Sequence, residues 1–330
     1  LGLPIPKEYE GGGTDYVSYA LVVEEIAKIC ASTAIIISAN TSLAGGPILR
    51  YGTDEQKKKF LPDLASGRKI GAFCLTEPDA GTDASRQLAT AVDQGDHYVL
   101  NAHKKFITNG GLAGTYIVFA MTDKSKGNAG ISTFIVDGDS EGIRTGKLEK
   151  KMGIRASQTA EMHFENVIVP KENRLGEPGQ GFSIAMGTLD GGRIGVAAQS
   201  LGVAQACLDE AVKYAKERKQ FGKYLYEHQG IAFMIADMAT KVKAARELVY
   251  DAAVTKDNGG NSTLASSMAK YYASEICNEV AAKSLQIHGG YGFVRGFKIE
   301  RLYRDCRVFT IYEGTSQIQQ MVIAGQIVGK

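Results

Sequence analysis

Cysteine is scarce in this sequence, and its spacing excludes two ways of stabilising a fold. The chain has 330 residues and no Cys-x-x-Cys pair, and its five cysteines are Cys30, Cys74, Cys207, Cys277 and Cys306. An odd number of widely scattered cysteines is not expected for a disulfide framework or a structural zinc site. We therefore expect free thiols and a reducing compartment, with a large core supplied by the 44% of residues that are apolar.

Three familiar ligand-binding patterns are also missing. No predicted strand is followed by Gly-x-Gly-x-x-Gly, no Walker A loop is present, and no group of histidine, cysteine and aspartate has metal-ligand spacing. These absences argue against a Rossmann-type nucleotide site, and we expect no metal. A nucleotide cofactor would need another kind of binding site.

The sequence has no large excess of either basic or acidic residues. The 38 basic and 36 acidic residues are interspersed and leave a net charge of +2, so we expect neither nucleic acid nor a membrane surface as a partner. The longest stretch without charge, residues 29–49, could span a membrane by length, but it contains polar residues such as Asn40 and glycines such as Gly45. This stretch is typical of a buried core helix followed by a turn, and we expect no membrane insertion.

The hydrophobic pattern changes twice along the chain. Residues 15–65 have helical spacing, and Thr53 with Gln56 forms a capping box at a helix start. From about residue 70 to 170 the period becomes two and turn signals are frequent, which is typical of a β-domain. The expected strands are 89–92, 97–102, 115–121, 131–136 and 159–169.

After Pro170 the pattern is helical again. Long helices are expected at 181–218, 228–256, 262–288 and 316–328, and four such helices indicate a bundle. The sequence therefore predicts an α+β multi-domain protein. Its parts are an N-terminal helical region at 1–68, a small middle β-domain, barrel or sandwich, at 69–172, and a C-terminal four-helix bundle at 173–330.

The last expected strand alternates strictly between two kinds of residue. Even-numbered positions from Ala160 to Phe164 are apolar, whereas odd-numbered positions from Glu161 to Glu165 are ionisable. Because successive side chains of a strand point to opposite faces, one face should be buried and the other wet.

One carboxylate lies in a short loop beside a helix. Residues 311–317 read Ile-Tyr-Glu-Gly-Thr-Ser-Gln, and Ser316 with Gln319 matches a capping box for the helix that follows. Glu313 then lies next to a helix N-terminus, where the following glycine lets a ligand approach and free amides can face a developing oxyanion. This position suits a catalytic base, although a glutamate before a helix is more often a solvated charge that favours the helix dipole.

Four further motifs accompany this loop. They are Leu-Thr-Glu-Pro-Asp-Ala-Gly-Thr-Asp at 75–83, Phe-Ile-Thr-Asn-Gly-Gly at 106–111, Glu-Arg-Lys-Gln-Phe-Gly at 217–222 and Gln-Ile-His-Gly-Gly-Tyr-Gly at 286–292. In order and separation, the five motifs resemble the acyl-CoA dehydrogenase family, closest to its short-chain, butyryl-type branch. The resemblance covers nearly the whole chain but starts some way into such proteins, so we expect a missing N-terminal segment of one or two helices.

The resemblance implies an FAD site between the β-domain and the bundle. On the β-domain it assigns Phe73, Leu75, Thr76, Gly81, Thr82, Phe106 and Thr108. On the bundle it assigns Arg218, Phe221, Gln229, Gln286, Gly289, Gly290, Thr315 and Gln317. Thr108 should bond near the reactive flavin nitrogen, Phe106 replaces the tryptophan of many relatives, and Arg218 should reach the pyrophosphate bound by a neighbouring subunit. Without the resemblance, these threonines are ordinary strand residues and Arg218 complements a helix dipole.

The resemblance also assigns the substrate side. Glu313 would be the catalytic base, because the position that a minority of relatives use for an alternative carboxylate is Gly192. The residues expected to contact the acyl-CoA are Thr82, Ser157, Asp190, Arg193, Tyr312 and Gly314. Arg193 would hold either the CoA moiety or the catalytic loop.

The activity implied is FAD-dependent α,β-dehydrogenation of a short-chain acyl-CoA to the trans-2-enoyl-CoA, as in fatty acid β-oxidation. Electrons would pass to an electron-transferring flavoprotein, and the enzyme would be a homotetramer built as a dimer of dimers. Alternatives are a glutaryl-type or cyclic acyl-CoA dehydrogenase, an enzyme run as an enoyl-CoA reductase, and a non-catalytic helical scaffold. We expect the bacterial cytoplasm, with the mitochondrial matrix as the alternative.

Overall fold

The computed structural model describes residues 1–329, which form two compact units. The first unit contains residues 1–15, 36–150 and 157–192. The second contains residues 16–35, 151–156 and the chain from 193 onward. Lys330, the last residue of the predicted C-terminal domain, lies outside the described residues.

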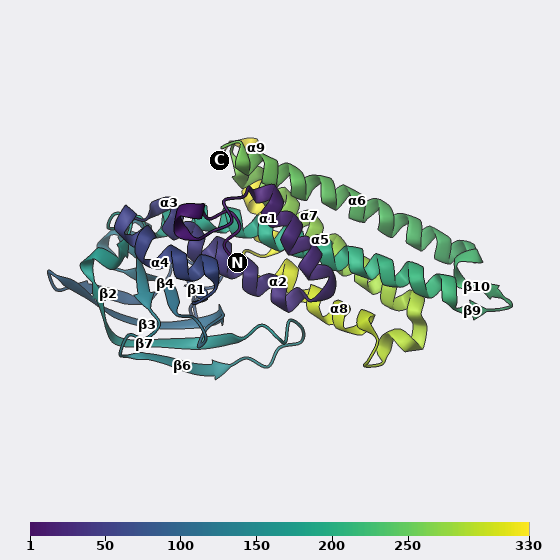
Figure 1. Ribbon diagram of the computed structural model, residues 1–330, viewed down its shortest axis with the longest axis horizontal. Coiled ribbons are helices and arrows are strands. Elements are labelled where there is room, and N and C mark those ends of the chain that lie inside the picture. Colours follow the sequence, from purple (N-terminus) through teal and green to yellow (C-terminus); the bar gives the residue numbers. More distant parts are fainter. Residues whose placement is uncertain (330) are drawn as a thin grey trace. The chain divides into compact units, whose positions relative to one another are not determined.

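An eight-stranded sheet is the centre of the first unit (Figure 1). Its strands are β1 (Gly71–Cys74), β2 (Thr90–Asp93), β3 (His97–Thr108), β4 (Thr115–Met121), β5 (Ile131–Asp137), β6 (Ile143–Leu148), β7 (Thr159–Pro170) and β8 (Arg174–Leu175). The order is β6-β7-β3-β2-β4-β5-β8, with β1 pairing parallel to β4. All five predicted strands are confirmed, β3 extends beyond its predicted end, and β1, β6 and β8 were not predicted.

Alternate residues of β4 enter two different apolar clusters. Ile117 and Phe119 pack with Leu61 and Leu64 of helix α4 (Asp54–Ser66), whereas Val118 packs on the other side of the sheet with residues of β3 and β7. Every residue of β4 is therefore buried, as expected for a strand covered on both faces. The predicted capping box of Thr53 and Gln56 is confirmed at the start of α4.

The long uncharged stretch is helical but not followed by the expected turn. Helix α2 (Ala31–Ser38) continues into the π-helical segment η2 (Ala39–Gly45) and then into α3 (Gly46–Tyr51). Asn40 explains the tight packing here, because its side chain donates to the Leu64 carbonyl at 3.0 Å and accepts from the Gly71 amide at 2.8 Å. Across residues 1–329, no helix is long and apolar enough to cross a membrane.

The second unit is a helical bundle. Its helices are α1 (Tyr16–Ile29), the part of α5 (Gly181–Glu217) from residue 193, α6 (Gln229–Asp257), α7 (Ser262–His288), α8 (Lys298–Cys306) and α9 (Ser316–Val328). The four predicted long helices are confirmed, and α1 and α8 complete the unit. A small hairpin of β9 (Lys219–Gln220) and β10 (Lys223–Tyr224) joins α5 to α6.

Helix α1 belongs to the bundle through specific polar contacts. The Asp257 carboxylate, at the end of α6, accepts hydrogen bonds from the Tyr16 and Val17 amides at 2.8 and 3.1 Å, and it thereby caps α1. Further along, buried Glu24 pairs with Arg246 of α6. These contacts group the helices differently from the predicted three-segment division of the chain, which stays a prediction.

All five cysteines are free, as expected, and four are buried. Burial raises the pKa of Cys74 to about 12, so that this thiol is unreactive at neutral pH.

Candidate active site

Glu313 lies in a strained loop between the 3₁₀ turn η7 (Arg307–Thr310) and helix α9. Its φ angle is 51°, in the left-handed region, and the next residue, Gly314, has a φ of 92°. Glycine adopts this conformation freely, but a glutamate there costs on the order of 1–3 kcal/mol. Strain of this kind persists where the surroundings hold a side chain in one required position.

Two side chains hold the loop by its backbone. The Lys270 ammonium of α7 donates to the Gly314 carbonyl at 2.7 Å, and the Gln319 side chain donates to the same carbonyl at 3.0 Å. Gln319 also reaches the Glu313 carbonyl at 3.3 Å. The peptide between Glu313 and Thr315 is thus fixed from two helices.

The predicted capping box of Ser316 and Gln319 is wrong by one residue. The side chain of Thr315 accepts from the Ile318 amide at 3.3 Å and is the N-cap of α9. Ser316 instead donates to Glu275 of α7, and Gln319 holds the loop. Because Ser316 bonds α7 and Gln319 bonds the loop carbonyls, the N-cap position passes to Thr315.

The carboxylate of Glu313 lies in an unusual environment. Both of its oxygens are buried, and neither has a hydrogen-bond partner in the part of the chain that the structure describes. Burial raises the pKa of Glu313 to about 7, while the positive charges of Lys270 and Arg193 act in the opposite direction. A carboxylate with this pKa can take up and release a proton near neutral pH.

Lys270 is the residue that the sequence analysis missed. It is fully buried, and burial lowers its pKa to about 8, against the opposing charge of Glu313. It lies on a face of α7 whose other residues are small, such as Ser266, Ala273 and Ser274. A lone lysine among small residues at helical spacing is the signal that could have identified it.

Two predicted substrate residues flank this loop. Arg193 is buried and donates to the Ser267 hydroxyl at 3.4 Å. The Tyr312 hydroxyl donates to Gln199, whose amide in turn donates to the Ala31 carbonyl at 2.7 Å. Burial raises the pKa of Tyr312 well above its ordinary value, so it stays a neutral phenol.

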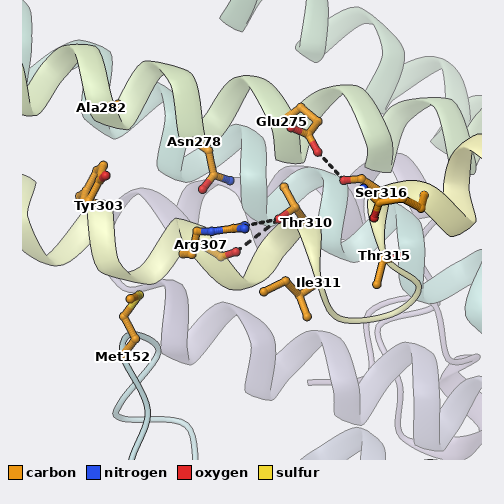
Figure 2. Close-up of a pocket in the computed structure, with 11 residues that line it drawn as sticks. Met152, Glu275, Asn278, Ala282, Tyr303, Arg307, Thr310, Ile311, Thr315 and Ser316 are labelled. Atoms are coloured by element: carbon orange, nitrogen blue, oxygen red, sulfur yellow. Dashed lines mark hydrogen bonds between the residues drawn. The ribbon is translucent and has the colours of Figure 1, made fainter. Parts of the chain in front are cut away.

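A cavity of about 510 Å³ opens beside the loop within the bundle (Figure 2). Thr315 and Gln317, two of the predicted FAD contacts, line it together with Arg307 and Ile311. Figure 2 shows the Glu275 and Ser316 side chains bonded to each other at its edge. The volume lies in the range of small-molecule and cofactor sites.

On the β-domain, the structure brings two predicted flavin motifs together. The Lys105 amide donates to the Thr76 carbonyl at 2.9 Å, which places Thr76 beside Phe106. Phe106 is 59% exposed with a left-handed φ of 58°, so its ring is available to a ligand. Thr76 and Thr108 are half-buried.

The remaining predicted residues of this unit have mixed surroundings. Phe73 packs edge-to-face on Phe119 at 4.9 Å, and Leu75 is buried in the same cluster. Gly81 and Thr82 are exposed, and a Cβ on Gly81 would meet nothing within 4 Å. Of the substrate candidates in this unit, Asp190 is half-buried, and Ser157 is only 1% exposed, so its hydroxyl does not face solvent.

A buried ion pair supports the Thr76 loop and was not predicted. Lys104 is fully buried and donates to the Glu77 carboxylate at 2.8 Å, to Gln87 at 3.0 Å and to the Leu75 carbonyl at 3.2 Å. The same carboxylate accepts from the Leu88 and Ala89 amides at 2.6 and 3.1 Å. Every hydrogen of the ammonium has an acceptor, so the loop is rigidly held.

The other predicted FAD residues lie exposed at one end of the bundle, around β9 and β10 and the end of α7 (Figure 1). They are Arg218, Phe221, Gln229, Gln286, Gly289 and Gly290. The Phe221 ring is 94% exposed, and a Cβ on either glycine would meet nothing within 4 Å. The contact of Glu275 with Ser316 lies about three turns of α7 from Gln286, or roughly 16 Å.

Three domain families match the chain in the order of its segments. The acyl-CoA dehydrogenase N-terminal domain matches residues 1–68, the middle domain residues 72–167 and the C-terminal domain residues 179–328. The chain belongs to the acyl-CoA dehydrogenase family. It is an oxidoreductase of this FAD-dependent family and has the family's fold of helical, β and helical domains.

Individual relatives are similar over the whole chain. The caffeyl-CoA reductase-Etf complex subunit CarC of Acetobacterium woodii is 57% identical over 330 residues, which is 100% of this chain and 87% of the relative. The 3-(aryl)acrylate reductase of Clostridium sporogenes is 51% identical over 99% of this chain and 87% of its own length. The solved butyryl-CoA dehydrogenase of Megasphaera elsdenii is 51% identical, with a TM-score of 0.98 over 99% of this chain and 86% of that one.

Observations within each unit fit the FAD that the family uses. The exposed Phe106 ring and the open space at Gly81 suit a ring and a phosphate group on the β-domain. In the bundle, the cavity at Thr315 and the open glycines beside exposed Phe221 leave room for an extended cofactor. Arg218, which immediately precedes the β9–β10 hairpin, offers a bidentate fork suited to pyrophosphate.

Proposed function

We propose that this protein is a short-chain acyl-CoA dehydrogenase that interconverts an acyl-CoA thioester and its trans-2-enoyl-CoA. The observation that carries the proposal is the Glu313 carboxylate, which is buried, without hydrogen bonds from residues 1–329, and near neutral in pKa. An acyl-CoA has a weakly acidic α-carbon, and its desaturation needs a base that is not solvated or bonded elsewhere.

Glu313 removes the α-proton in this proposal. Its left-handed backbone holds the side chain in place, and the Gly314 carbonyl is occupied by Lys270 and Gln319. The loop is therefore preorganised, and the proton moves to a carboxylate whose pKa of about 7 favours its uptake. A placed general base typically contributes about 10²–10⁴-fold to the rate.

Residues of both the β-domain and the bundle would hold FAD. The chemistry that bound FAD would supply is an acceptor for the hydride of the substrate's β-carbon. Thr76 and Thr108 would offer hydrogen bonds to the flavin, Phe106 would pack on its ring, and Thr315 and Gln317 would bind from the bundle. Arg193 would hold the CoA moiety or the Glu313 loop, and its charge, which lowers the pKa of the Glu313 carboxyl, supports this role.

The exposed bundle end supports an oligomeric site. Gln286 lies about three helical turns along α7 from the contact of Glu275 with Ser316, and Arg218 and the large exposed Phe221 and Phe293 rings are at the same end of the bundle. We propose that this end completes the FAD site of a neighbouring subunit, in a homotetramer built as a dimer of dimers.

The physiological reaction could also run in the opposite direction, as the reduction of an enoyl-CoA. Two of the similar relatives are reductases of unsaturated acyl groups, and one of them is a subunit of an Etf complex. In that direction Glu313 acts as an acid that delivers the α-proton, and a pKa of about 7 allows this role as well. In either direction the proposed electron partner is an electron-transferring flavoprotein, and the proposed compartment is the bacterial cytoplasm.

The test uses the purified flavoprotein with a panel of CoA thioesters. We expect anaerobic butyryl-CoA or hexanoyl-CoA to bleach the visible flavin absorbance, with higher kcat/KM for chains of about four to six carbons than for sixteen. To test the reductase direction, the reduced protein is mixed with crotonyl-CoA or with caffeyl-CoA, and the rate at which the visible flavin absorbance returns is compared. If no acyl-CoA and no enoyl-CoA changes the visible absorbance of the flavoprotein, the proposal is wrong.

A further inference from the structure

The solvent face of the sheet carries two histidines directly opposite each other. In the antiparallel pairing of β3 with β7, His103 is in register with His163. Glu161 precedes His163 by two residues and therefore points to the same face. The predicted alternation of β7 is confirmed, because Ala160, Met162 and Phe164 are buried, whereas Glu161 and His163 are half-buried and Glu165 is exposed.

The three side chains converge. The His103 Nε2 atom lies 2.5 Å from a Glu161 oxygen, and the two imidazole rings stack with centroids 4.4 Å apart at an interplanar angle of 15°. One possible ligand atom from each residue lies within 4.8 Å of the other two. Within residues 1–329, no other group of three or more histidine, cysteine or carboxylate side chains is as close.

The neighbouring strand leaves room for this cluster. Gly146 of β6 lies beside the His163 ring, and a Cβ at that position would be 2.9 Å from His163 Nε2. A side chain on Gly146 would collide with the ring. The glycine thus keeps the ligand nitrogen accessible on the open face.

The protonation states suit a cation. The hydrogen bond from His103 lowers the pKa of Glu161, which is therefore ionised at neutral pH. Burial lowers the pKa of His163, and the charges of His103 and Arg144 act in the same direction, against those of Glu161 and Glu165. Arg144 itself is engaged by Glu165 at 2.7 Å.

We propose that His103, Glu161 and His163 form a binding site for a divalent transition-metal ion that prefers nitrogen and oxygen ligands, with Zn²⁺ as the test ion. Two imidazoles and one carboxylate are a common zinc ligand set that leaves a fourth position open to water. Zinc ligands at about 2.0–2.1 Å lie roughly 3.3 Å from each other, so the rings must tilt apart from their stack and Glu161 must exchange its bond to His103 for the metal.

The sequence alone did not predict this site, because its ligands come from two strands, and His103 and Glu161 are 58 residues apart in the chain. The expectation that no metal binds rested on spacing within one segment. A metal here bridges β3 and β7 on their exposed face, and none of its ligands belongs to the residues proposed to bind FAD or the acyl-CoA.

The test is isothermal titration calorimetry of ZnCl₂ into the FAD-loaded protein after removal of metals with a chelator. We expect one zinc per chain, and at least about tenfold weaker binding for His163→Gln and for Glu161→Gln. His97→Gln is the matched control, because His97 starts the same strand and its side chain is bonded to Asp96, at 2.7 Å, rather than to the cluster. Its zinc affinity should equal that of the wild type.

Zinc X-ray absorption on the wild type gives a readout that does not depend on how the variants fold. Two imidazoles and additional oxygen ligands are expected around the metal. Absence of a one-to-one site, an affinity unchanged in His163→Gln, an equal loss in His97→Gln, or a spectrum without imidazole would each overturn the proposal.

Discussion

Each unit of this member of the acyl-CoA dehydrogenase family buries a lysine close to a glutamate, but the two lysines form different hydrogen bonds. In the β-domain, Lys104 donates directly to Glu77 at 2.8 Å, and the carboxylate accepts two backbone amides as well. In the bundle, Lys270 donates to the Gly314 carbonyl, and the Glu313 oxygens have no hydrogen-bond partner in the described chain.

This difference separates a structural charge from a reactive one. The Glu77 carboxylate accepts hydrogen bonds from Lys104 and from the Leu88 and Ala89 amides, so it holds the Thr76 loop in place and supports the fold. The carboxylate of Glu313 keeps its lone pairs, and burial without bonds raises its pKa to about 7. Lys270 donates to the loop backbone instead of to the Glu313 carboxylate, so the carboxylate oxygens stay available to accept a proton.

The largest expected effect is the loss of turnover when Glu313 is changed. Glu313→Gln keeps the size of the side chain but removes its basicity, so turnover of butyryl-CoA should fall by at least about 10²–10⁴-fold. FAD content, measured by visible absorbance, should be unchanged because Glu313 is not proposed to hold the cofactor. Flavin reduction at close to the wild-type rate would show that another group is the base.

Loss of the Lys104–Glu77 ion pair should lower the stability of the fold. Lys104→Met leaves the Glu77 charge buried without its partner, which typically costs about 3–5 kcal/mol, measured as the free energy of unfolding in urea. Lys126→Met removes an exposed ion pair with Asp123 and should cost less than about 1 kcal/mol. Equal losses in the two variants would mean that the buried pair adds nothing beyond a surface contact.

The same contrast explains what the sequence could and could not predict. The long helices and β7 have strong periodic patterns, β4 and β5 are buried along nearly their whole length, and all of them were found. Strand β6 was missed because it is an exposed edge strand with the polar sequence Ile-Arg-Thr-Gly-Lys-Leu, and β1 because it has only four residues. In both cases burial does not impose an alternating pattern on the strand.

The site was predictable where a motif is local. Glu313 was placed correctly beside α9 because the glycine and the helix start lie within a few residues. Lys104 and Lys270 were not predicted, since a lysine is normally exposed and only distant partners make its burial tolerable. The capping residue was misplaced for the same reason, because Glu275 of α7 binds Ser316.

A smaller effect is expected when the accompanying lysine is removed. Lys270→Met deletes the positive charge that acts most strongly against the raised pKa of Glu313. The pKa should rise further, so the alkaline-rising limb of kcat/KM moves to higher pH and activity at pH 7 falls. Lys283→Met, on the same helix but bonded to Asp237 and Glu279 at the surface, is the control. An unshifted profile in Lys270→Met would mean that this lysine only supports the loop.

The smallest effect is a pH dependence of stability. The pKa of Glu313 is raised from its ordinary 4.5 to about 7 in the folded protein, so its neutral form is the one that the fold favours. The stabilisation is fully present below pH 4.5 and is lost as the pH rises to 7. The thermal midpoint of the wild type should therefore decline relative to that of Glu313→Gln across this interval and run parallel to it above pH 8. A difference between the two midpoints that stays constant from pH 4.5 to 8 would show that the carboxylate is not shifted, and the contrast with Glu77 would then rest on hydrogen bonding alone.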